Sequence, residues 1–207
     1  GGTLAAIFQN RSLDMKSIIS LLLILFSFLA KAQEIETSEE SILQKAELYN
    51  NAWQNLDASS LPKEERIKIE HEEISIEYCA ERANYYYTEL VNNFPSSKNY
   101  LSYLFNKGSL AADIRKSDDA IKSLTKVIEI VESEKLNKFN TIPVTDLCYY
   151  QKLSFYYLVR VYESDGNCLN AKYYVAKLEK LKSDKLNEYE NWDINETIKR
   201  INRNCSN

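Results

Sequence analysis

Apolar side chains recur at steps of three and four residues along most of this chain, a spacing that gathers them on one face of an α-helix. The first such segment follows Ser38, a residue type that caps helix N-termini, and continues through Leu43, Ala46, Tyr49 and Trp53. Six further segments follow. The predicted helices span residues 38–56, 63–94, 98–114, 117–134, 143–164, 168–181 and 194–204. The pattern therefore predicts an all-α chain with about seven helices.

The segment 63–94 is the one place where the periodicity is ambiguous. Its second half carries a stripe at helical spacing, Ile76, Ala80, Ala83, Tyr87, Leu90 and Phe94, which predicts a buried helix face. In its first half, isoleucines partly alternate with polar residues, as in a strand, but the charged run at 70–73 breaks the alternation. We therefore predict helix, either as one long element or as two abutting ones.

Turn-forming residues are scarce, which supports the helical prediction. The chain holds only four glycines and three prolines, fewer than a sheet protein of this size needs for its turns. The expected connections are the polar stretch 135–142, a tight turn at 165–167 and a polar link at 183–193.

The N-terminal region resembles a targeting signal. Met15, the only methionine, is followed by Lys16, an apolar run from Ile18 to Ala30 and the small-x-small sequence Ala30-Lys31-Ala32. A transmembrane anchor is the alternative, but it needs roughly 20 apolar residues and this run is shorter. We predict that 15–32 is a signal peptide, that 1–14 is upstream, non-native sequence, and that 33–207 is one exported domain. We expect it in the periplasm or secreted, with no stable membrane insertion after cleavage.

The charge and the polar residues exclude several kinds of chemistry. A formal net charge of −4 gives no electrostatic footprint for nucleic acid. His71 is the only histidine, no Cys-x-x-Cys pair or glycine-rich phosphate loop occurs, and no metal or cofactor site is predicted. We expect His71 to pack between helices and predict that the protein is not an enzyme.

A repeated pattern stands out in the C-terminal third. Phe155-x2-Leu158-Val159-x2-Tyr162 is followed by Gly166-Asn167 and then by Ala171-x3-Val175-x2-Leu178. Large side chains in these positions fill the space between two paired helices, alanine allows their close approach, and glycine permits the turn. This segment resembles a tetratricopeptide repeat, a family built from helical hairpins.

Weaker copies of the pattern lie upstream. Ala120-x3-Leu124-x2-Val127 repeats the second helix, with Gly108 and Ala111 at the matching spacings before it and Arg115 in the place of Gly166. Ala83-x3-Tyr87-x2-Leu90 repeats it again. The alanines are 37 and 51 residues apart, whereas the family period is about 34. The resemblance implies antiparallel hairpins in a short right-handed solenoid over 33–207; a generic helical bundle is the alternative.

The resemblance also implies a function and a binding surface. Members of this family bind proteins or peptides on a concave face formed mainly by the first helix of each hairpin. The corresponding positions here are Asn99, Ser102, Asn106, Leu153, Tyr156, Arg160 and Glu163. The lysine and asparagine clamp that some members use for C-terminal carboxylates is absent. The alternatives are an envelope enzyme that uses Glu and Tyr side chains in a cleft, and a structural spacer.

Tyrosine is unusually frequent, with 15 copies that often stand next to one another. Neighbours on a helix point about 100° apart, so one ring of each pair can pack while the other reaches a second face. Most tyrosines are expected to pack between helices and a minority to line a groove. We expect Tyr156 and Arg160 to face a ligand, and Phe155 and Leu158 to face the core, so that Tyr156→Ala has little effect on stability.

Four cysteines, Cys79, Cys148, Cys168 and Cys205, would remain after signal cleavage. A terminal helix antiparallel to 168–181 brings its end back to the level of Cys168, where Cys205 follows it. We predict a disulfide between these two, with two free thiols as the alternative. Cys79 and Cys148 are expected to stay unpaired or buried.

Overall fold

The structure, a computed structural model, describes residues 38–71, 75–136, 142–181 and 186–205. The chain divides into two compact units, Gly1–Ser41 and Ile42–Asn207. Of the first unit only 38–41 are described, where the Ser41 amide donates to the Ser38 hydroxyl at 3.2 Å, as expected of a capping serine. The predicted signal peptide 15–32 and the segment 1–14 lie outside the described residues.

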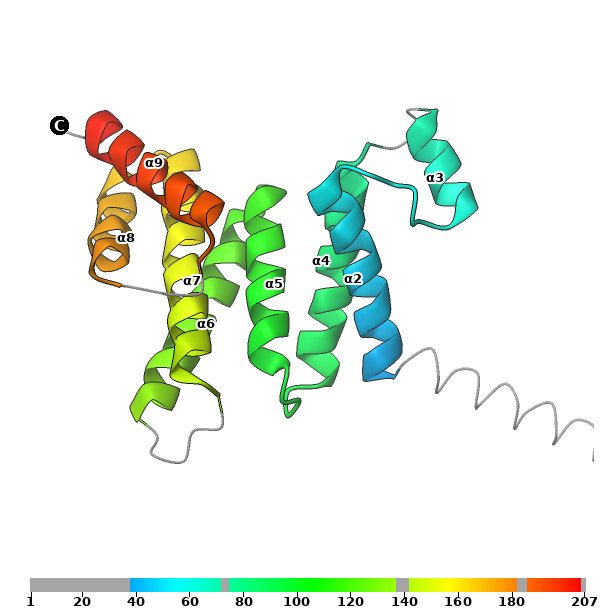
Figure 1. The fold of residues 1–207 in the computed structure, drawn as a ribbon, viewed down its shortest axis with the longest axis horizontal. Helices are drawn as coiled ribbons and strands as arrows, with labels where there is room; N and C mark the ends of the chain where they lie inside the picture. Colours follow the sequence, from blue (N-terminus) through cyan, green and yellow to red (C-terminus); the bar gives the residue numbers. More distant parts are fainter. Residues whose placement is uncertain (1–37, 72–74, 137–141, 182–185, 206–207) are drawn as a thin grey trace, which may run out of the picture. The chain divides into compact units, whose positions relative to one another are not determined.

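All regular structure in the described ranges is helical, which confirms the all-α prediction. The eight helices there are α2 (Glu39–Asn55), α3 (Lys63–Glu70), α4 (Glu77–Asn93), α5 (Tyr100–Asp113), α6 (Ser117–Leu136), α7 (Val144–Ser164), α8 (Cys168–Lys180) and α9 (Glu188–Asn204) (Figure 1). The sequence predicted about seven helices. The additional helix is α3, because the predicted segment 63–94 is divided into α3 and α4.

The ambiguous segment 63–94 forms two helices. The short helix α3 buries none of its side chains, and His71 is exposed at its C-terminal end, so the prediction that His71 packs between helices is wrong. The α4 stripe is buried as predicted, at Ala80, Ala83, Tyr87 and Leu90. It packs with buried residues of α2 and α5 in one of the hydrophobic clusters.

The helices α5 and α6 form a hairpin, and α7 and α8 form a second one (Figure 1). At the first turn the Lys116 amide donates to the Ala111 carbonyl at 2.8 Å; at the second, the Asn167 amide donates to the Tyr162 carbonyl at 2.8 Å. The backbone φ is +58° at Arg115 and +70° at Gly166. Both turns therefore use one residue in the left-handed conformation, although only the second places glycine there.

Close approach of the paired helices explains the buried small residues. Ala120 and Ala171 are fully buried at matching positions of α6 and α8. A Cβ atom on Gly108 would lie 2.8 Å from the Leu124 Cγ atom, so only glycine leaves space where α5 crosses α6. The residues that the sequence pattern singled out thus lie where the two helices of each hairpin meet.

The last helix, α9, begins at Glu188, six residues before the predicted start at 194. Asn187 and Glu190 form a capping box, in which each side chain accepts from the other residue's backbone amide at 2.8 Å. The prediction that 183–193 is only a polar link is therefore wrong from 188 onward. The apolar spacing alone did not reach these polar residues, whereas the Asn-x-x-Glu capping signal marks the true start.

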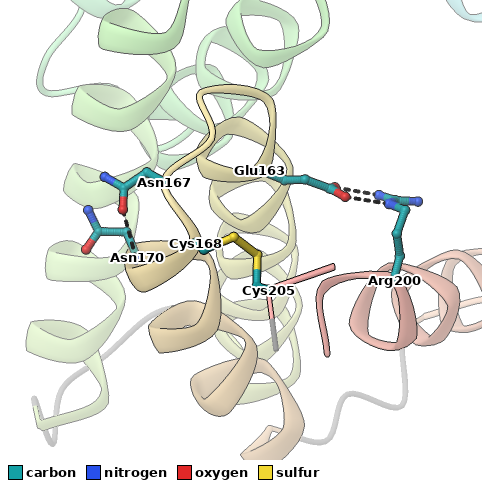
Figure 2. The surroundings of a disulfide bond; sticks show 6 residues. All are labelled: Glu163, Asn167, Cys168, Asn170, Arg200 and Cys205. Atoms are coloured by element: carbon teal, nitrogen blue, oxygen red, sulfur yellow. Dashed lines mark hydrogen bonds and ion pairs between the residues drawn. A yellow bond between two sulfur atoms is a disulfide. The ribbon is translucent and has the colours of Figure 1, made fainter. Parts of the chain in front are cut away.

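A disulfide joins Cys168 at the start of α8 to Cys205 at the end of α9, as predicted, with Cα atoms 5.4 Å apart. Figure 2 shows this bond beside an ion pair between Glu163 of α7 and Arg200 of α9. Cys79 is free and buried, and Cys148 is free and partly buried. The disulfide and the ion pair both hold α9 against the second hairpin.

Candidate binding cleft

A cleft of about 490 Å³ lies between α7 and α9 and reaches the C-terminal ends of α2 and α5. Its lining is mostly polar and aromatic. The lining residues are Gln54, Asp113, Leu153, Tyr156, Tyr157, Arg160, Asn187, Tyr189, Glu190, Asp193 and Ile194.

The α7 wall of the cleft follows from helical spacing. Leu153, Tyr156, Tyr157 and Arg160 are three or four residues apart, so they lie on one face of α7. The Arg160 guanidinium carbon lies 5.6 Å from the centre of the Tyr156 ring and 5.5 Å from that of Tyr157. The two rings therefore hold the arginine by cation–π contacts.

The α9 wall is joined to α7 by three polar contacts. The Tyr149 hydroxyl donates to Glu190 at 3.2 Å, and the Tyr156 hydroxyl donates to Asp193. Arg200 donates two hydrogen bonds to Glu163, at 2.7 and 2.8 Å. Bidentate arginine–carboxylate pairs fix orientation as well as distance, so α9 is held in one position over α7.

Burial changes the acid–base behaviour of these tyrosines. Loss of water, followed by the charge of Glu190 and its hydrogen bond, raises the pKa of Tyr149 to about 12. Burial and the hydrogen bond to Asp193 also raise the pKa of Tyr156 above its usual range. Both hydroxyls therefore stay protonated and act as hydrogen-bond donors at neutral pH.

The inner end of the cleft holds an ion pair. Arg160 Nη1 lies 3.3 Å from Asp113 Oδ1, with the carboxylate side chain 22% exposed and the arginine 40%. Burial raises the pKa of the Asp113 carboxyl, and the attraction of Arg160 opposes that rise. A second cavity, of about 500 Å³, also contains both residues in its lining, together with Arg115 and Ser117. The Asp113–Arg160 pair thus contributes to both cavities.

The predicted site residues of the second hairpin come together, but not on an open face. Leu153 is 7% exposed and Tyr156 is 6% exposed, because both are covered by α9. The ring of Tyr156 is part of the core, so we now expect Tyr156→Ala to lower stability, in contrast to the expectation from the sequence. Arg160 lines the cleft beside them, whereas Glu163 is paired with Arg200 outside it.

The predicted residues of α5 and the residue just before it do not line this cleft. Asn99, Ser102 and Asn106 are all partly buried. The Asn99 side-chain amide donates to the Tyr103 hydroxyl at 3.2 Å, so this side chain contacts the first turns of the helix that follows it. Whether these three positions contact a partner stays a prediction.

The α9 wall is the part of the cleft that the sequence pattern missed. Asn187, Tyr189, Glu190 and Asp193 all fall in the stretch that was predicted to be a connection. The capping box is the signal that could have placed them on a helix, because it fixes the start of α9 and hence the direction of each side chain.

The described residues of the lining carry an excess of negative charge. Among them Asp113, Glu190 and Asp193 supply carboxylates, and Arg160 is the one cation. Within the described ranges, no three His, Cys, Asp or Glu side chains are arranged to hold a metal ion. None of the helices that the structure describes has the length and apolar character of a membrane span.

Comparisons of the chain with protein-family models, with curated proteins and with solved structures found no match. The resemblance to tetratricopeptide repeats therefore stays a prediction that rests on the residues quoted above.

Proposed function

We propose that this protein is an exported, non-catalytic module of tetratricopeptide-repeat type that binds a protein or peptide in the cleft between α7 and α9. The cleft itself carries the proposal. It is formed by α7 and α9, which are joined by three polar contacts, and the disulfide ties α9 to the neighbouring helix α8. The cleft is therefore a preorganised concave surface. Tyrosine and arginine, which line it, are the residue types enriched at binding hot spots.

The repeat arrangement is supported by the two hairpins. Their turns have the same hydrogen-bond pattern. Each turn also has one residue in the left-handed conformation at the same position, Arg115 in the first and Gly166 in the second, 51 positions apart. A generic helical bundle has no reason to repeat both the turn geometry and the buried alanine at one spacing. A solenoid of hairpins leaves a face for ligands along its first helices, and the α7 wall of the cleft belongs to such a helix.

Export is supported by two independent features, the predicted signal peptide 15–32 and the Cys168–Cys205 disulfide. Disulfides persist in oxidising compartments and are rare in a reducing cytosol. Mass spectrometry of the protein recovered outside the cytoplasm should show a chain that starts at or near Gln33. Recovery of a soluble form that still carries residues 18–30 would contradict export by this signal.

Binding is preferred over catalysis because the partly buried carboxylate at the inner end of the cleft is neutralised. Asp113 is paired with Arg160, and the remaining carboxylates accept hydrogen bonds from tyrosines. This arrangement stabilises fixed charges, and the raised pKa values of Tyr149 and Tyr156 disfavour the deprotonated form that a tyrosine nucleophile needs.

Site-specific photocrosslinking in the native cells tests the proposal. A benzophenone amino acid replaces Tyr189, which lines the cleft and is 72% exposed, or Leu169 of α8, which is 82% exposed and lies outside it. We expect a discrete protein or peptide adduct from position 189 and none from position 169. Equal adducts from both positions, or none from position 189, would contradict a binding cleft at this site.

A further inference from the structure

We infer that the cleft binds a basic polypeptide segment, whose lysine or arginine side chain enters among the carboxylates while the neighbouring residues lie on an aromatic pair at the rim. This inference rests on the proposed function and adds the chemical class of the partner. Three features support a basic partner: the charge of the lining, the Tyr157 hydroxyl inside the cleft and the exposed rings of α9.

The charge balance of the cleft favours a cation. Arg160 is already 3.3 Å from Asp113, so that ion pair is locally neutral. Glu190 and Asp193 are the remaining carboxylates among the described lining residues, and each accepts from a tyrosine hydroxyl. Glu190 also accepts from the Asn187 amide, and Asp193 is attracted by Arg160 and by Arg200, which pairs with Glu163. A carboxylate can accept several hydrogen bonds, so an ammonium or guanidinium group has acceptors available. An anionic or phosphorylated segment would be repelled by the same groups.

Tyr157 offers a further contact inside the cleft. Its ring packs edge-on against Phe105 and Tyr156, with ring centres 6.0 and 5.3 Å away. Its side chain is mostly buried and lines the cleft, yet its hydroxyl makes no hydrogen bond within the described part of the chain. The buried side-chain atoms without a partner in the described residues are Arg82 Nε and Ser154 Oγ, so the Tyr157 hydroxyl is open to the cleft and can accept from water or from a ligand. The ammonium or guanidinium of a ligand is a suitable donor to this oxygen.

The rim of the cleft is aromatic and exposed. Tyr189 is 72% exposed and Trp192 is 59% exposed, and their ring centres lie 6.2 Å apart on α9. Tyr189 also lines the cleft, so the pair extends the cleft onto the surface. Aromatic faces attract the cations and alkyl stems of lysine and arginine, and Trp is the strongest of them. A free polyamine needs only the carboxylates, whereas a polypeptide gains from the carboxylates and the rings together.

Selection of short randomised peptides displayed on phage tests the inference on the full chain with its disulfide intact. We expect the enriched sequences to be rich in lysine and arginine. Calorimetry then measures the affinity of one enriched peptide for the unchanged protein and for variants of the cleft. Asp193→Asn keeps an oxygen that accepts from Tyr156. Glu190→Gln keeps one oxygen, which can accept from the Asn187 amide of the capping box, and its NH2 group can donate to the Tyr149 hydroxyl in place of the oxygen that accepted from it. Both variants therefore remove a charge and leave a polar contact between α7 and α9.

Each of these variants, and Trp192→Ala, should weaken binding about tenfold, the change expected when a charged or cation–π contact is lost. Glu196→Gln is the matched control, because Glu196 is a carboxylate of α9 that pairs with Lys199 at 2.7 Å and does not line the cleft. It should bind the peptide like the unchanged protein. Circular dichroism should show the same helix content in all four variants.

The contrary outcomes separate the inference from the proposed function. Enriched peptides with no excess of basic residues, or an affinity that is unchanged in Asp193→Asn and Glu190→Gln, would contradict the inference of a basic ligand. Neither outcome would contradict peptide binding in the cleft. Spermidine that competes as well as the peptide, together with no effect of Trp192→Ala, would identify a free polyamine and overturn a polypeptide partner. No enrichment at all would overturn the proposed function itself.

Discussion

The two hairpins α5–α6 and α7–α8 share the positions that make a hairpin and differ at those that face α9. Ala120 and Ala171 are buried at equivalent positions, and Arg115 and Gly166 adopt the same turn conformation. With the spacing of 51 residues, Tyr156 corresponds to Phe105, Glu163 to Ala112 and Cys168 to Ser117.

The differing residues of the second hairpin are the ones that hold the last helix. The Tyr156 hydroxyl donates to Asp193, Glu163 pairs with Arg200, and Cys168 is bonded to Cys205. Their counterparts in the first hairpin lack the groups for these contacts. In the first hairpin these contacts are replaced by helix packing, because both α4 and α7 pack against it. A terminal hairpin that would otherwise expose an apolar face is thus closed by a polar, cross-linked helix, and the cleft forms at that junction.

Among the substitutions that exchange a residue of one hairpin for that of the other, removal of the disulfide should have the largest effect. Cys168→Ser installs the residue that the first hairpin has at Ser117. The bond closes a loop with a sequence separation of 37, so its loss should lower the free energy of unfolding by about 3–4 kcal/mol in the chain-entropy model. Urea unfolding without reductant measures this change. Cys79→Ser, at a buried free thiol, is the control for thiol loss alone. An unchanged midpoint for Cys168→Ser would contradict a disulfide in the folded protein.

Substitution of Gly108, the residue where α5 crosses α6, should have the next largest effect on stability. Gly108→Val places in α5 the side chain that α7 has at Val159, and its Cβ would meet Leu124 Cγ at 2.8 Å. Overpacking of this kind typically lowers the free energy of unfolding by about 1–3 kcal/mol. Thermal unfolding monitored by circular dichroism measures the loss.

A second substitution checks the cause of that loss. Leu124→Ala removes the atoms that the new valine would meet, so the double variant should recover part of the cost of Gly108→Val, although each single change is destabilising. Strict additivity of the two losses would show that the clash is elsewhere.

The hydroxyl that joins α7 to α9 should contribute less. Tyr156→Phe installs the residue of the first hairpin, Phe105, and removes only the hydrogen bond to Asp193. We expect a loss of about 0.5–1.5 kcal/mol. Tyr156→Ala, by contrast, truncates a ring that is 6% exposed and should cost about 3–5 kcal/mol, like other core truncations. Chemical unfolding of both variants gives the two values, and equal losses would show that the ring itself contributes nothing.

The sequence predicted the parts of this molecule that apolar spacing controls. Ala120, Ala171 and the α4 stripe are buried where a period of three and four places them, because helix pairing depends on those positions alone. The disulfide followed from the direction of the last helix. These features can be predicted because they depend only on local apolar spacing and on the direction of helices joined by short connections.

The cleft could not be predicted in the same way. Tyr156 was expected on an open face because its spacing along α7 shows which side it occupies but not what covers that side. Its cover, Asp193, lies 37 residues further along, in a stretch too polar to show helical periodicity. The turn at Arg115 does not follow from its residue type for a related reason: the surrounding helices impose a left-handed backbone conformation that an arginine disfavours.

The smallest expected effect concerns that turn, and it compares the two hairpins most directly. Arg115 at φ +58° carries a Cβ atom in a conformation that costs L-residues roughly 1–2 kcal/mol, and its side chain is exposed. Arg115→Gly should therefore raise the free energy of unfolding by up to about 1 kcal/mol, since glycine's larger entropy in the unfolded chain offsets part of the relief. Gly166→Arg should lower it by a similar amount, because nothing lies within 4 Å of the new Cβ atom and the cost is confined to the backbone. Urea titrations of both variants and of the double exchange measure these changes, and the double exchange should have nearly the stability of the unchanged protein. A loss of stability for Arg115→Gly would show that the arginine side chain, and not the left-handed turn, stabilises the first hairpin.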